Sequence, residues 1–498
     1  MTSQQRSARV LVAGGGPVGM LAAAELGRYG VDTLVLESNP RTVDQPKAGT
    51  LHARSVQSLA RRGYLRTRQA RPDDLRERRT EAFHFAGVPG LAITAPGTEP
   101  PPILGRAQAD LERDFEARAR ERGVRVLRGH RVTGLRQDPD GVAVTAEGPA
   151  GPEVFTAEYL IGADGARSTV REAAGIGSRT HPATVAALLG LVRLVEPGLV
   201  PPGWHRTPNG WIISGINPFG HSRVITIDFS GPHPDRRAEP TLEELRAEAA
   251  RVLGRPVPMD DAVFLSRFSD FARVVRRYRE GRVLLAGDAA HVHFPVGGQG
   301  LNLGLQDAVD LSWKLAFTLT GRAGKGLLDS YDEDRRPAAE RVVENTRAQL
   351  ALMRPDPALD PLRGLMAELL TLGQVNDHLG DMISAQEDHN GRFLPNLPLE
   401  VDGSPTDLIR LLDHPRALLL VLSPEPRLDV ELVADPDGYA PEGWVRSVRA
   451  VRAKPPAGVR LPWDALLLRP DGYLAWAPGD RAGARAALRH WFGEPEPS

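Results

Sequence analysis

Residues 282–308 read RVLLAGDAAHVHFPVGGQGLNLGLQDA, and this stretch carries the strongest structural signals in the chain. The apolar run over 283–286 predicts a buried strand, and Gly287-Asp288 predicts a tight turn that presents a carboxylate. A Pro/Gly-rich loop then leads into a helix whose first turn carries three glycines. Glycine lets the backbone come close to a ligand, and a helix N-terminus favours a ligand atom that is or becomes negative. We therefore expect a ligand site at this strand–turn–helix unit.

A second glycine-rich turn, GGGPVG at 14–19, lies near the N-terminus between an apolar strand and an Ala/Leu-rich helix. Glu37 follows Gly19 by 18 residues, at the end of the next predicted strand. Dinucleotide-binding folds place an acid at this distance on the adenosine ribose and the glycine turn on the pyrophosphate. A lone GxGxxG motif is weak evidence, whereas the motif in this context is specific. Because the two glycine-rich turns are far apart in sequence, a shared site requires a discontinuous domain with an insertion.

The composition is that of an ordinary globular protein. The chain has 498 residues, of which 41% are apolar and 25% charged, and its net charge is −1. It therefore lacks the charge excess that favours nucleic-acid or membrane partners. It contains no cysteine, which excludes disulfides, cysteine–zinc sites, iron–sulfur clusters and thiol catalysis. We expect about three domains and a cytoplasmic protein, since no signal sequence or long apolar run is seen.

The segment beyond Gly175 has apolar strands without glycine-rich turns at their ends, which is typical of an antiparallel sheet. Three strands and one helix are expected there, at 185–194, 210–216, 223–229 and 241–253. In the third strand, Arg223, Ile225 and Phe229 share one face. The sequence leaves open whether that face covers the core or lines a cavity.

Three motifs now stand in a fixed order: GGGPVG at 14–19, GADGARS at 162–168 and the glycine-rich stretch that begins at 286. In order and spacing they resemble the three fingerprints of the class A flavoprotein aromatic hydroxylases, the para-hydroxybenzoate hydroxylase-like family. The motif LLLRPDGYLAW at 466–476 is similar to the C-terminal domain of the phenol hydroxylase branch. That branch includes bacterial polyketide-tailoring hydroxylases. The segment AGTLHARSVQSL at 48–59 resembles the corresponding segment of those enzymes.

The resemblance implies an α/β fold: a Rossmann-like (GR2-type) FAD-binding domain with an inserted antiparallel-sheet substrate domain and a C-terminal thioredoxin-like α/β domain. The expected boundaries are 1–176 with 270–390 for the FAD-binding domain, 177–269 for the substrate domain and 391–498 for the tail. Since the tail has no cysteine, we expect it to be structural or interfacial and not redox-active.

The resemblance also implies roles toward FAD. Glu37 is expected on the adenosine ribose, and Gln108 and Asp288 on ribityl hydroxyls. Lys47 falls where the family usually has an arginine on the pyrophosphate, and Arg54 is a further candidate there. The full cofactor-binding set is expected to be Gly14, Gly16, Pro17, Val18, Gly19, Glu37, Lys47, Arg54, Gln108, Asp164, Asp288, Pro295, Gly298, Gly300, Leu301 and Asn302.

Some of these positions bear on the chemistry. The backbone carbonyl of Pro295 lies in the loop that the family brings close to the reacting edge of the flavin. The amides of Leu301 and Asn302 are expected to face the flavin N1/O2 edge, where a reduced flavin carries negative charge. His291 and His293 have no third ligand nearby, so we expect them to be structural and expect no metal.

The function that this resemblance implies is an FAD-dependent monooxygenase that uses O2 and NADPH or NADH. It would hydroxylate a polycyclic aromatic substrate of polyketide type through a flavin C4a-hydroperoxide. The cofactor supplies the difficult chemistry, which agrees with the lack of a catalytic triad or carboxylate pair. Aromatic residues in the insertion suggest a large planar ligand. The pocket candidates are Trp211, Arg223, Ile225 and Phe229, although each aromatic alone is more typical of a core.

Three alternatives stay open. A Baeyer–Villiger or epoxidising enzyme would use the same scaffold and change only the last step. A flavin-dependent halogenase is disfavoured because no WxWxIP-type segment is seen. A non-catalytic FAD-binding protein would not be reduced by NADPH. The substrate, the choice of nicotinamide and the formation of a homodimer are not determined by the sequence.

Overall fold

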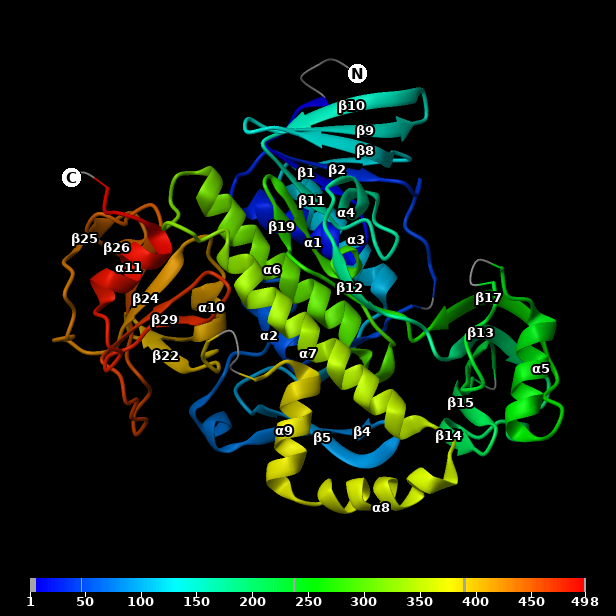
Figure 1. The fold of residues 1–498 in the computed structure, drawn as a ribbon. Coiled ribbons are helices and arrows are strands. Elements are labelled where there is room, and N and C mark those ends of the chain that lie inside the picture. The colour runs from blue at the N-terminus through cyan, green and yellow to red at the C-terminus, as the bar shows by residue number, and fades with distance from the viewer. Residues whose placement is uncertain (1–5, 46, 218, 236–237, 388–390, 497–498) are drawn as a thin grey trace.

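The structure is a computed structural model that describes residues 6–45, 47–217, 219–235, 238–387 and 391–496. Its centre is a six-stranded sheet in the order β19-β20-β11-β1-β2-β7 (Figure 1). The strands are β1 (Val10–Ala13), β2 (Thr33–Glu37), β7 (Arg125–Arg128), β11 (Tyr159–Gly162), β19 (Arg279–Glu280) and β20 (Val283–Leu285). Their apolar runs are buried on both faces, as expected of a covered parallel sheet.

Parallel pairing brings the N-terminal glycine turn and the distant stretch that begins at residue 282 together. β1 pairs in parallel with β2 and β11, and β11 pairs in parallel with β20. The two glycine-rich turns follow β1 and β20, so they lie at the same edge of the sheet. The predicted discontinuous arrangement, with residues of the C-terminal half completing the N-terminal sheet, is therefore present in the fold.

Helices cover this sheet. The covering helices are α1 (Pro17–Arg28), α3 (Gln108–Glu121), α4 (Thr169–Ala173), α6 (Gln299–Leu319) and α7 (Ser330–Met353). α1 packs against both α3 and α6, and α6 is buried along most of its length. Two smaller sheets adjoin: β8 (Arg131–Gln137), β9 (Val142–Gly148) and β10 (Gly151–Ala157), and β12 (Ser178–His181), β18 (Ala272–Val275) and β21 (His291–Val292). No helix of the described residues is long and apolar enough to cross a membrane.

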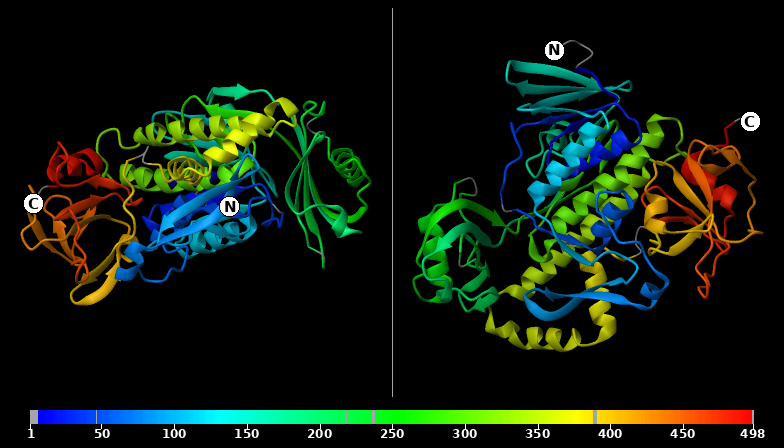
Figure 2. Two further views of the ribbon diagram at one scale, coloured as in Figure 1. Left: turned by 90° about the horizontal axis from the view of Figure 1, so that it is seen from below. Right: turned by 180° about the vertical axis from the view of Figure 1, so that it is seen from behind.

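The insertion is a five-stranded antiparallel sheet in the order β14-β15-β16-β13-β17. Its elements are β13 (Ala186–Leu194), β14 (Gly203–Thr207), β15 (Gly210–Gly215), β16 (Ser222–Asp228), α5 (Leu242–Leu253) and β17 (Met259–Ser269). The predicted strands and helix are confirmed within one or two residues; Phe229 lies just beyond β16. Figure 2 shows α5 on the outer face of the sheet and the other face turned to the main body.

The position of α5 shows which face of β16 packs in the core of the insertion and which face is turned to the main body. Val224 packs in an apolar cluster with Leu245 and Val252 of α5. Ile225 and Ile227 belong to the opposite face, where the apolar cluster includes Phe294 of the segment between β20 and α6. The face that carries Arg223 and Ile225 therefore looks toward the glycine-rich loop of the opening stretch.

A hairpin that we did not predict from the sequence packs against both the insertion and the loop before α6. It consists of β4 (Arg78–Phe85) and β5 (Val88–Pro96), and α8 (Asp360–Leu369) and α9 (Gly373–Ser384) pack on β5. Nearby are α2 (Ala53–Arg61) and the short pair of β3 (Thr50–His52) and β6 (Ile103–Gly105). The hairpin contributes Phe85, Val88 and Leu91 to the same apolar cluster as Ile227.

The tail is an α/β unit with a mixed six-stranded sheet in the order β25-β26-β27-β24-β28-β29. Its elements are β22 (Pro398–Val401), β23 (Ser404–Asp407), α10 (Leu408–Leu412), β24 (Ala417–Val421), β25 (Leu432–Asp435), β26 (Gly438–Pro441), β27 (Val448–Arg452), β28 (Ala465–Leu468), β29 (Leu474–Trp476) and α11 (Ala484–Phe492). β24 pairs in parallel with β27 and antiparallel with β28. The predicted hairpin at 466–476 is confirmed, and the predicted α/β fold class holds for the whole chain.

Candidate functional site

The glycines of the first turn are needed for different structural reasons. Gly14 has φ +101°, and a Cβ on it would lie 2.3 Å from the carbonyl oxygen of Ala163. A Cβ on Gly19 would lie 2.0 Å from the carbonyl oxygen of Gly14. Gly16, in contrast, has open space around its Cα and caps α1, with Pro17 at the first helical position. Gly14 and Gly19 are therefore required by packing, whereas Gly16 leaves room at a helix N-terminus where a pyrophosphate fits.

Glu37 fastens this turn. Its carboxylate accepts hydrogen bonds from the backbone N–H of Gly15 at 2.5 Å and of Asn39 at 2.6 Å. The side chain is buried at the end of β2. The acid predicted for the ribose thus also holds the backbone of the glycine turn, a second task that motif spacing does not reveal.

The second turn, Gly287-Asp288, is held from behind by a buried charged group. Asp307 of α6 accepts hydrogen bonds from the N–H of Gly287 at 3.0 Å, from His291 Nε2 at 2.7 Å and from Arg335 Nε at 2.8 Å. His291 therefore has a structural partner. Asp288 itself is exposed, although both of its neighbours are buried. The turn presents one carboxylate outward from an otherwise closed backbone.

The protein around Asp288 nevertheless affects its ionisation. Desolvation by surrounding protein raises the pKa of the Asp288 carboxyl, and electrostatic interactions with His291 and Lys47 oppose this rise. Asn302 Nδ2 donates to Thr50 O at 3.0 Å, so the segment after β2 that carries Lys47 runs beside the start of α6. Gln108 begins α3 and donates its N–H to Ala48 O at 3.0 Å, so it lies beside the same segment. The structure thus gathers Lys47, Gln108 and Asp288 in one region.

The loop that precedes α6 is clasped to β3. The loop adopts left-handed conformations at Gly297 (φ +75°) and Gly298 (φ +65°), which explains why both are glycine. Asn302 Nδ2 donates to Gly298 O at 2.8 Å, and Asn302 Oδ1 accepts from the N–H of His52 at 2.8 Å. His52 Nε2 in turn donates to Gly297 O at 2.8 Å. We call residues 295–298 the glycine loop; its N-terminal residue is Pro295.

His52 was missed in the sequence, because a single histidine between a strand and a helix carries no spacing signal.

Gly300 lies next to His293, since a Cβ on Gly300 would be 3.3 Å from His293 Nε2. Leu301 is partly buried against the core. Val18 of α1 lies against Gly287 and Gly304, so the helices that follow the two turns pack tightly together. Gly304 is a further packing glycine that motif reading did not single out.

Two residues of the expected cofactor set have clear protein partners. Asp164 accepts hydrogen bonds from Ser168 Oγ and from the N–H of Val170, so it caps α4. Arg54 donates to Gln57 Oε1, Ala385 O and Gln386 O, and its guanidinium stacks 3.8 Å from the ring centroid of Phe393. These contacts direct Arg54 toward the tail, so its expected role on the pyrophosphate has no support in the structure.

The pocket candidates of the insertion separate into two groups. Trp211 is almost fully buried, packs against Gly87 and donates its indole N–H to Met353 O at 2.6 Å. It faces no open space and supports the wall from behind, so its expected place at the pocket surface needs correction. Arg223, Ile225 and Phe229 are only partly buried. They lie on the face toward the glycine loop, whose neighbour Phe294 contacts Phe268 of β17 with ring centroids 5.6 Å apart.

The site combines a glycine turn at a helix N-terminus with an acid at the end of the next strand and a second turn from a distant segment. These features together define a dinucleotide-binding protein. The chain belongs to the FAD binding domain family, whose model matches residues 7–346. Residues 387–495 match the C-terminal domain of the aromatic-ring hydroxylases. The predicted family membership and the predicted FAD cofactor are thereby confirmed.

Relatives match over nearly the whole chain. A 12-dehydrotetracycline 5-monooxygenase/anhydrotetracycline 6-monooxygenase of Streptomyces rimosus is 39% identical, covering 98% of this chain and 99% of the relative. A dialkyldecalin synthase of Streptomyces rugosporus is 40% identical over 97% of this chain and 98% of the relative. The solved anhydrotetracycline hydroxylase of Streptomyces rimosus has a TM-score of 0.84 at 37% identity, covering 98% and 100% of the two chains. The family therefore contains monooxygenases and at least one member with another named role.

Proposed function

We propose that this protein is an FAD-dependent monooxygenase that hydroxylates a polycyclic aromatic compound of polyketide type with O2 and NADPH or NADH. The observation that carries the proposal is the apolar sheet face beside the glycine loop. Several partly buried apolar side chains border the same cluster as Phe294 and Val296. They are Phe83, Ile103, Trp204, Ile213, Ile225, Phe229, Phe268, Met366, Leu379 and Met382. Partly open apolar side chains gathered next to a cofactor loop suit a flat, mostly apolar ligand.

The residues divide the work as follows. FAD, once bound and reduced by the nicotinamide, supplies the activation of O2 and the transfer of one oxygen atom to an electron-rich ring. Glu37 would hold the adenosine ribose, the turn around Gly16 and the Lys47 ammonium would hold the pyrophosphate, and Gln108 and Asp288 would hold the ribityl chain. The amides of Leu301 and Asn302 lie in the first turn of α6, where they would stabilise negative charge on the flavin ring system.

The remaining residues exclude water and orient the substrate. The carbonyl of Pro295 lies at the start of the glycine loop, where it accepts a hydrogen bond from Gly298 N–H at 3.2 Å. The ring of Phe294 closes the loop against Phe268 of the sheet. We propose 1–176 with 270–390 as the cofactor domain, 177–269 as the substrate domain and 391–498 as a stabilising tail.

Arg223 supplies a polar group on this apolar face. No hydrogen bond or ion pair is recorded for its side chain within the described residues, its Nε is buried without a partner, and burial lowers the pKa of the guanidinium. Arg223 pairs across the sheet with Leu191 and Gly215, four residues along the strand from Ile227. At about 3.3 Å per residue, Arg223 lies roughly 13 Å along the strand from Ile227. Ile227 itself belongs to the cluster that contains Phe294. A fused-ring substrate could thus reach Arg223 with an oxygen at its far end.

Replacing Arg223 by methionine should weaken the binding of an oxygenated polycycle. We expect the dissociation constant of 1,8-dihydroxyanthraquinone, measured by quenching of flavin fluorescence, to rise about tenfold or more, because a hydrogen bond from a charged donor is lost. Unsubstituted anthraquinone should be affected far less. Arg193→Met is the matched control, since Arg193 is an exposed residue of the same sheet that pairs with Asp260. Equal affinities in the Arg223→Met and wild-type proteins would refute this contact.

The dialkyldecalin synthase relative favours a second candidate, a cyclisation without net oxidation. A Baeyer–Villiger reaction is a third, because it needs the same cofactor site. Product analysis under ¹⁸O2 with NADPH tests all three. A hydroxylase gives one labelled phenolic oxygen, a Baeyer–Villiger enzyme gives a labelled ester, and a cyclase gives an unlabelled isomer with no NADPH consumed.

A further inference from the structure

The glycine loop is held from behind by a row of buried amide side chains. Asn345 Nδ2 donates to Gln299 Oε1 at 3.1 Å, and Gln349 Nε2 donates to Asn345 Oδ1 at 3.2 Å. Gln349 Oε1 accepts the backbone N–H of Ala86 at 3.0 Å. Asn345 and Gln349 are one turn apart on α7, and all three amide side chains are buried. The row therefore connects Ala86, in the turn of the β4–β5 hairpin, to the first residue of α6.

The amide row has a direction. From Ala86 through Gln349 and Asn345 to Gln299, each group donates an N–H to the side-chain oxygen of the next, so the dipoles are aligned and strengthen one another. The row ends at Gln299, whose Nε2 has no hydrogen-bond partner in the described part of the chain. It lies under the glycine loop, since a Cβ on Gly297 would be 3.2 Å from it. The row thus begins at the hairpin turn and ends at the glycine loop.

A second link joins the same two parts from the other side. His52 Nε2 donates to Gly297 O at 2.8 Å, and the His52 ring meets the Phe83 ring of β4 edge to face, with centroids 5.4 Å apart. Burial lowers the pKa of His52 to about 4, so the ring is neutral at neutral pH and keeps the N–H on Nε2. Gly297 is therefore linked to the hairpin through His52 and Phe83 as well as through the amide row.

Both links end in residues 83–86 of the β4–β5 hairpin, beside the apolar face of the insertion. We call residues 83–86 the substrate wall. Phe83 stacks on His84, His84 contacts Trp204 of the insertion, and Phe85 lies in the same apolar cluster. Ala86 adopts a left-handed conformation with φ +54°, which is uncommon for a residue with a Cβ. Its N–H bond to Gln349 and a bond from Arg363 to its carbonyl oxygen, at 3.2 Å, hold that conformation in place.

We propose that Asn345 and Gln349 are positioning residues that hold the glycine loop in register with the substrate wall. The proposal rests on the proposed function, because the register matters only where a substrate ring and the flavin must meet. Neither residue is expected to touch the substrate. When the row is broken, the loop and the wall can shift separately, and reduced cofactor then yields H2O2 in place of hydroxylated product.

Gln349→Met tests this directly, because methionine preserves the volume and removes both hydrogen bonds. With NADPH and saturating 1,8-dihydroxyanthraquinone, we expect hydroxylated product per NADPH oxidised to fall about tenfold, since displacements of about 1 Å can cost more than this. The FAD content and the KM for the probe should stay within about twofold of wild type, because cofactor and substrate contacts are retained. Asn345→Leu should have the same effect. The double variant should be no worse than either single one, because both break one row.

Asn376→Leu is the control for a loss of stability alone. Asn376 of α9 binds the same hairpin, accepting from the N–H of Ala92 at 2.9 Å and donating to Gly90 O at 2.7 Å. The recorded bonds of its side chain do not reach the glycine loop. We expect this variant to lose stability but to keep the wild-type yield of product per NADPH. Equal uncoupling in Asn376→Leu, wild-type coupling in Gln349→Met, or additive losses in the double variant would each overturn the proposal.

A second readout separates this proposal from the proposed function. In the wild type, binding of 1,8-dihydroxyanthraquinone should change the visible circular dichroism of the flavin, and in Gln349→Met this change should be reduced. If the wild type oxidises NADPH without labelled product, the proposed function fails, while the dichroism still reports whether the wall and the glycine loop are linked. An unchanged dichroism response in Gln349→Met would overturn the link whatever the reaction.

Discussion

Asp288→Ala is expected to yield a folded protein that has lost most of its FAD. The Asp288 carboxylate is exposed between two buried neighbours, so its oxygens can accept hydrogen bonds from a bound ligand. Each hydrogen bond from a ribityl hydroxyl to a carboxylate contributes about 1.5–3 kcal/mol, so the dissociation constant of FAD should rise at least about tenfold. The turn itself should survive, because Asp307 holds Gly287.

The measurement is the flavin content of the purified variant, followed by titration with FAD. Asp329→Ala serves as the control, since Asp329 is an exposed carboxylate that pairs with Arg279 beside the C-terminal end of α6, away from this turn. Circular dichroism in the far ultraviolet should match the wild type for both variants. A full complement of yellow cofactor in Asp288→Ala would show that this turn does not hold FAD.

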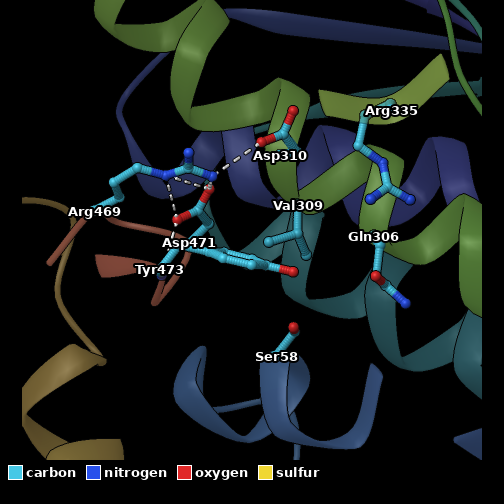
Figure 3. A pocket seen from close by; sticks show the side chains of 8 residues that line it. All are labelled: Ser58, Gln306, Val309, Asp310, Arg335, Arg469, Asp471 and Tyr473. Atoms are coloured by element: carbon cyan, nitrogen blue, oxygen red, sulfur yellow. Dashed lines mark hydrogen bonds and ion pairs between the residues drawn. The ribbon is translucent and has the colours of Figure 1, made fainter. Parts of the chain in front are cut away.

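Arg469→Met should cause the largest loss of stability. Arg469 lies at the hairpin of the tail, where it pairs with Asp471, and its Nη atoms lie 3.5 Å from Asp310 and 3.6 Å from Asp334. Figure 3 shows this hairpin against α6. The small cavity there has a volume of about 10 Å³, enough for one water at most. It is lined by Ser58, Gln306, Val309, Asp310, Arg335, Arg469, Asp471 and Tyr473.

Without the guanidinium, Asp471 would lose its ion pair, and Asp310 and Asp334 would be left with Lys314 as the partner of their ion pairs. Lys314 Nζ lies 2.9 Å from Asp310, and burial already raises the pKa of Asp310 to about 7. Removing one partner of a buried ion pair typically costs about 3–5 kcal/mol. Asp471 would also lose the partner that orients it toward the indole N–H of Trp313, at 3.0 Å. We therefore expect the tail to detach from α6 early in unfolding.

Urea denaturation of the FAD-loaded protein measures this loss as a change in the free energy of unfolding. Arg427→Met is the matched control, because Arg427 pairs with Asp464 on the surface of the same tail. Exposed pairs contribute about 0–1 kcal/mol, so this control should stay close to wild type. If Arg469→Met were no less stable than Arg427→Met, the hairpin would not anchor the tail.

The glycine turns of the candidate cofactor site could be predicted because they depend on backbone geometry. The turn at 14–19 needs glycine where a Cβ would meet another backbone, and such positions repeat at fixed spacing. Glu37 could be found because the acid must stand at the end of the second strand. The alternation in 223–229 identified the strand, but only the position of α5 decided which face is free.

Other features depend on contacts between distant residues and left no local signal. The β4–β5 hairpin was missed because β4 is largely exposed and shows no clean alternation. Arg54 was assigned to the pyrophosphate because a cation near a phosphate site is a reasonable guess, yet its partners come from the segment around 385. His52 and the amide row of α7 became visible only when the glycine loop was seen between them.

We propose above all that this protein transfers one oxygen atom from O2 to an aromatic ring. The most direct test is mass spectrometry of the product formed by the FAD-loaded protein from 1,8-dihydroxyanthraquinone and related polycyclic phenols, with NADPH under ¹⁸O2. We predict one ¹⁸O atom in a new phenolic hydroxyl, with NADPH consumption that depends on the phenol. Product that forms without NADPH, or that carries no ¹⁸O, would contradict the account.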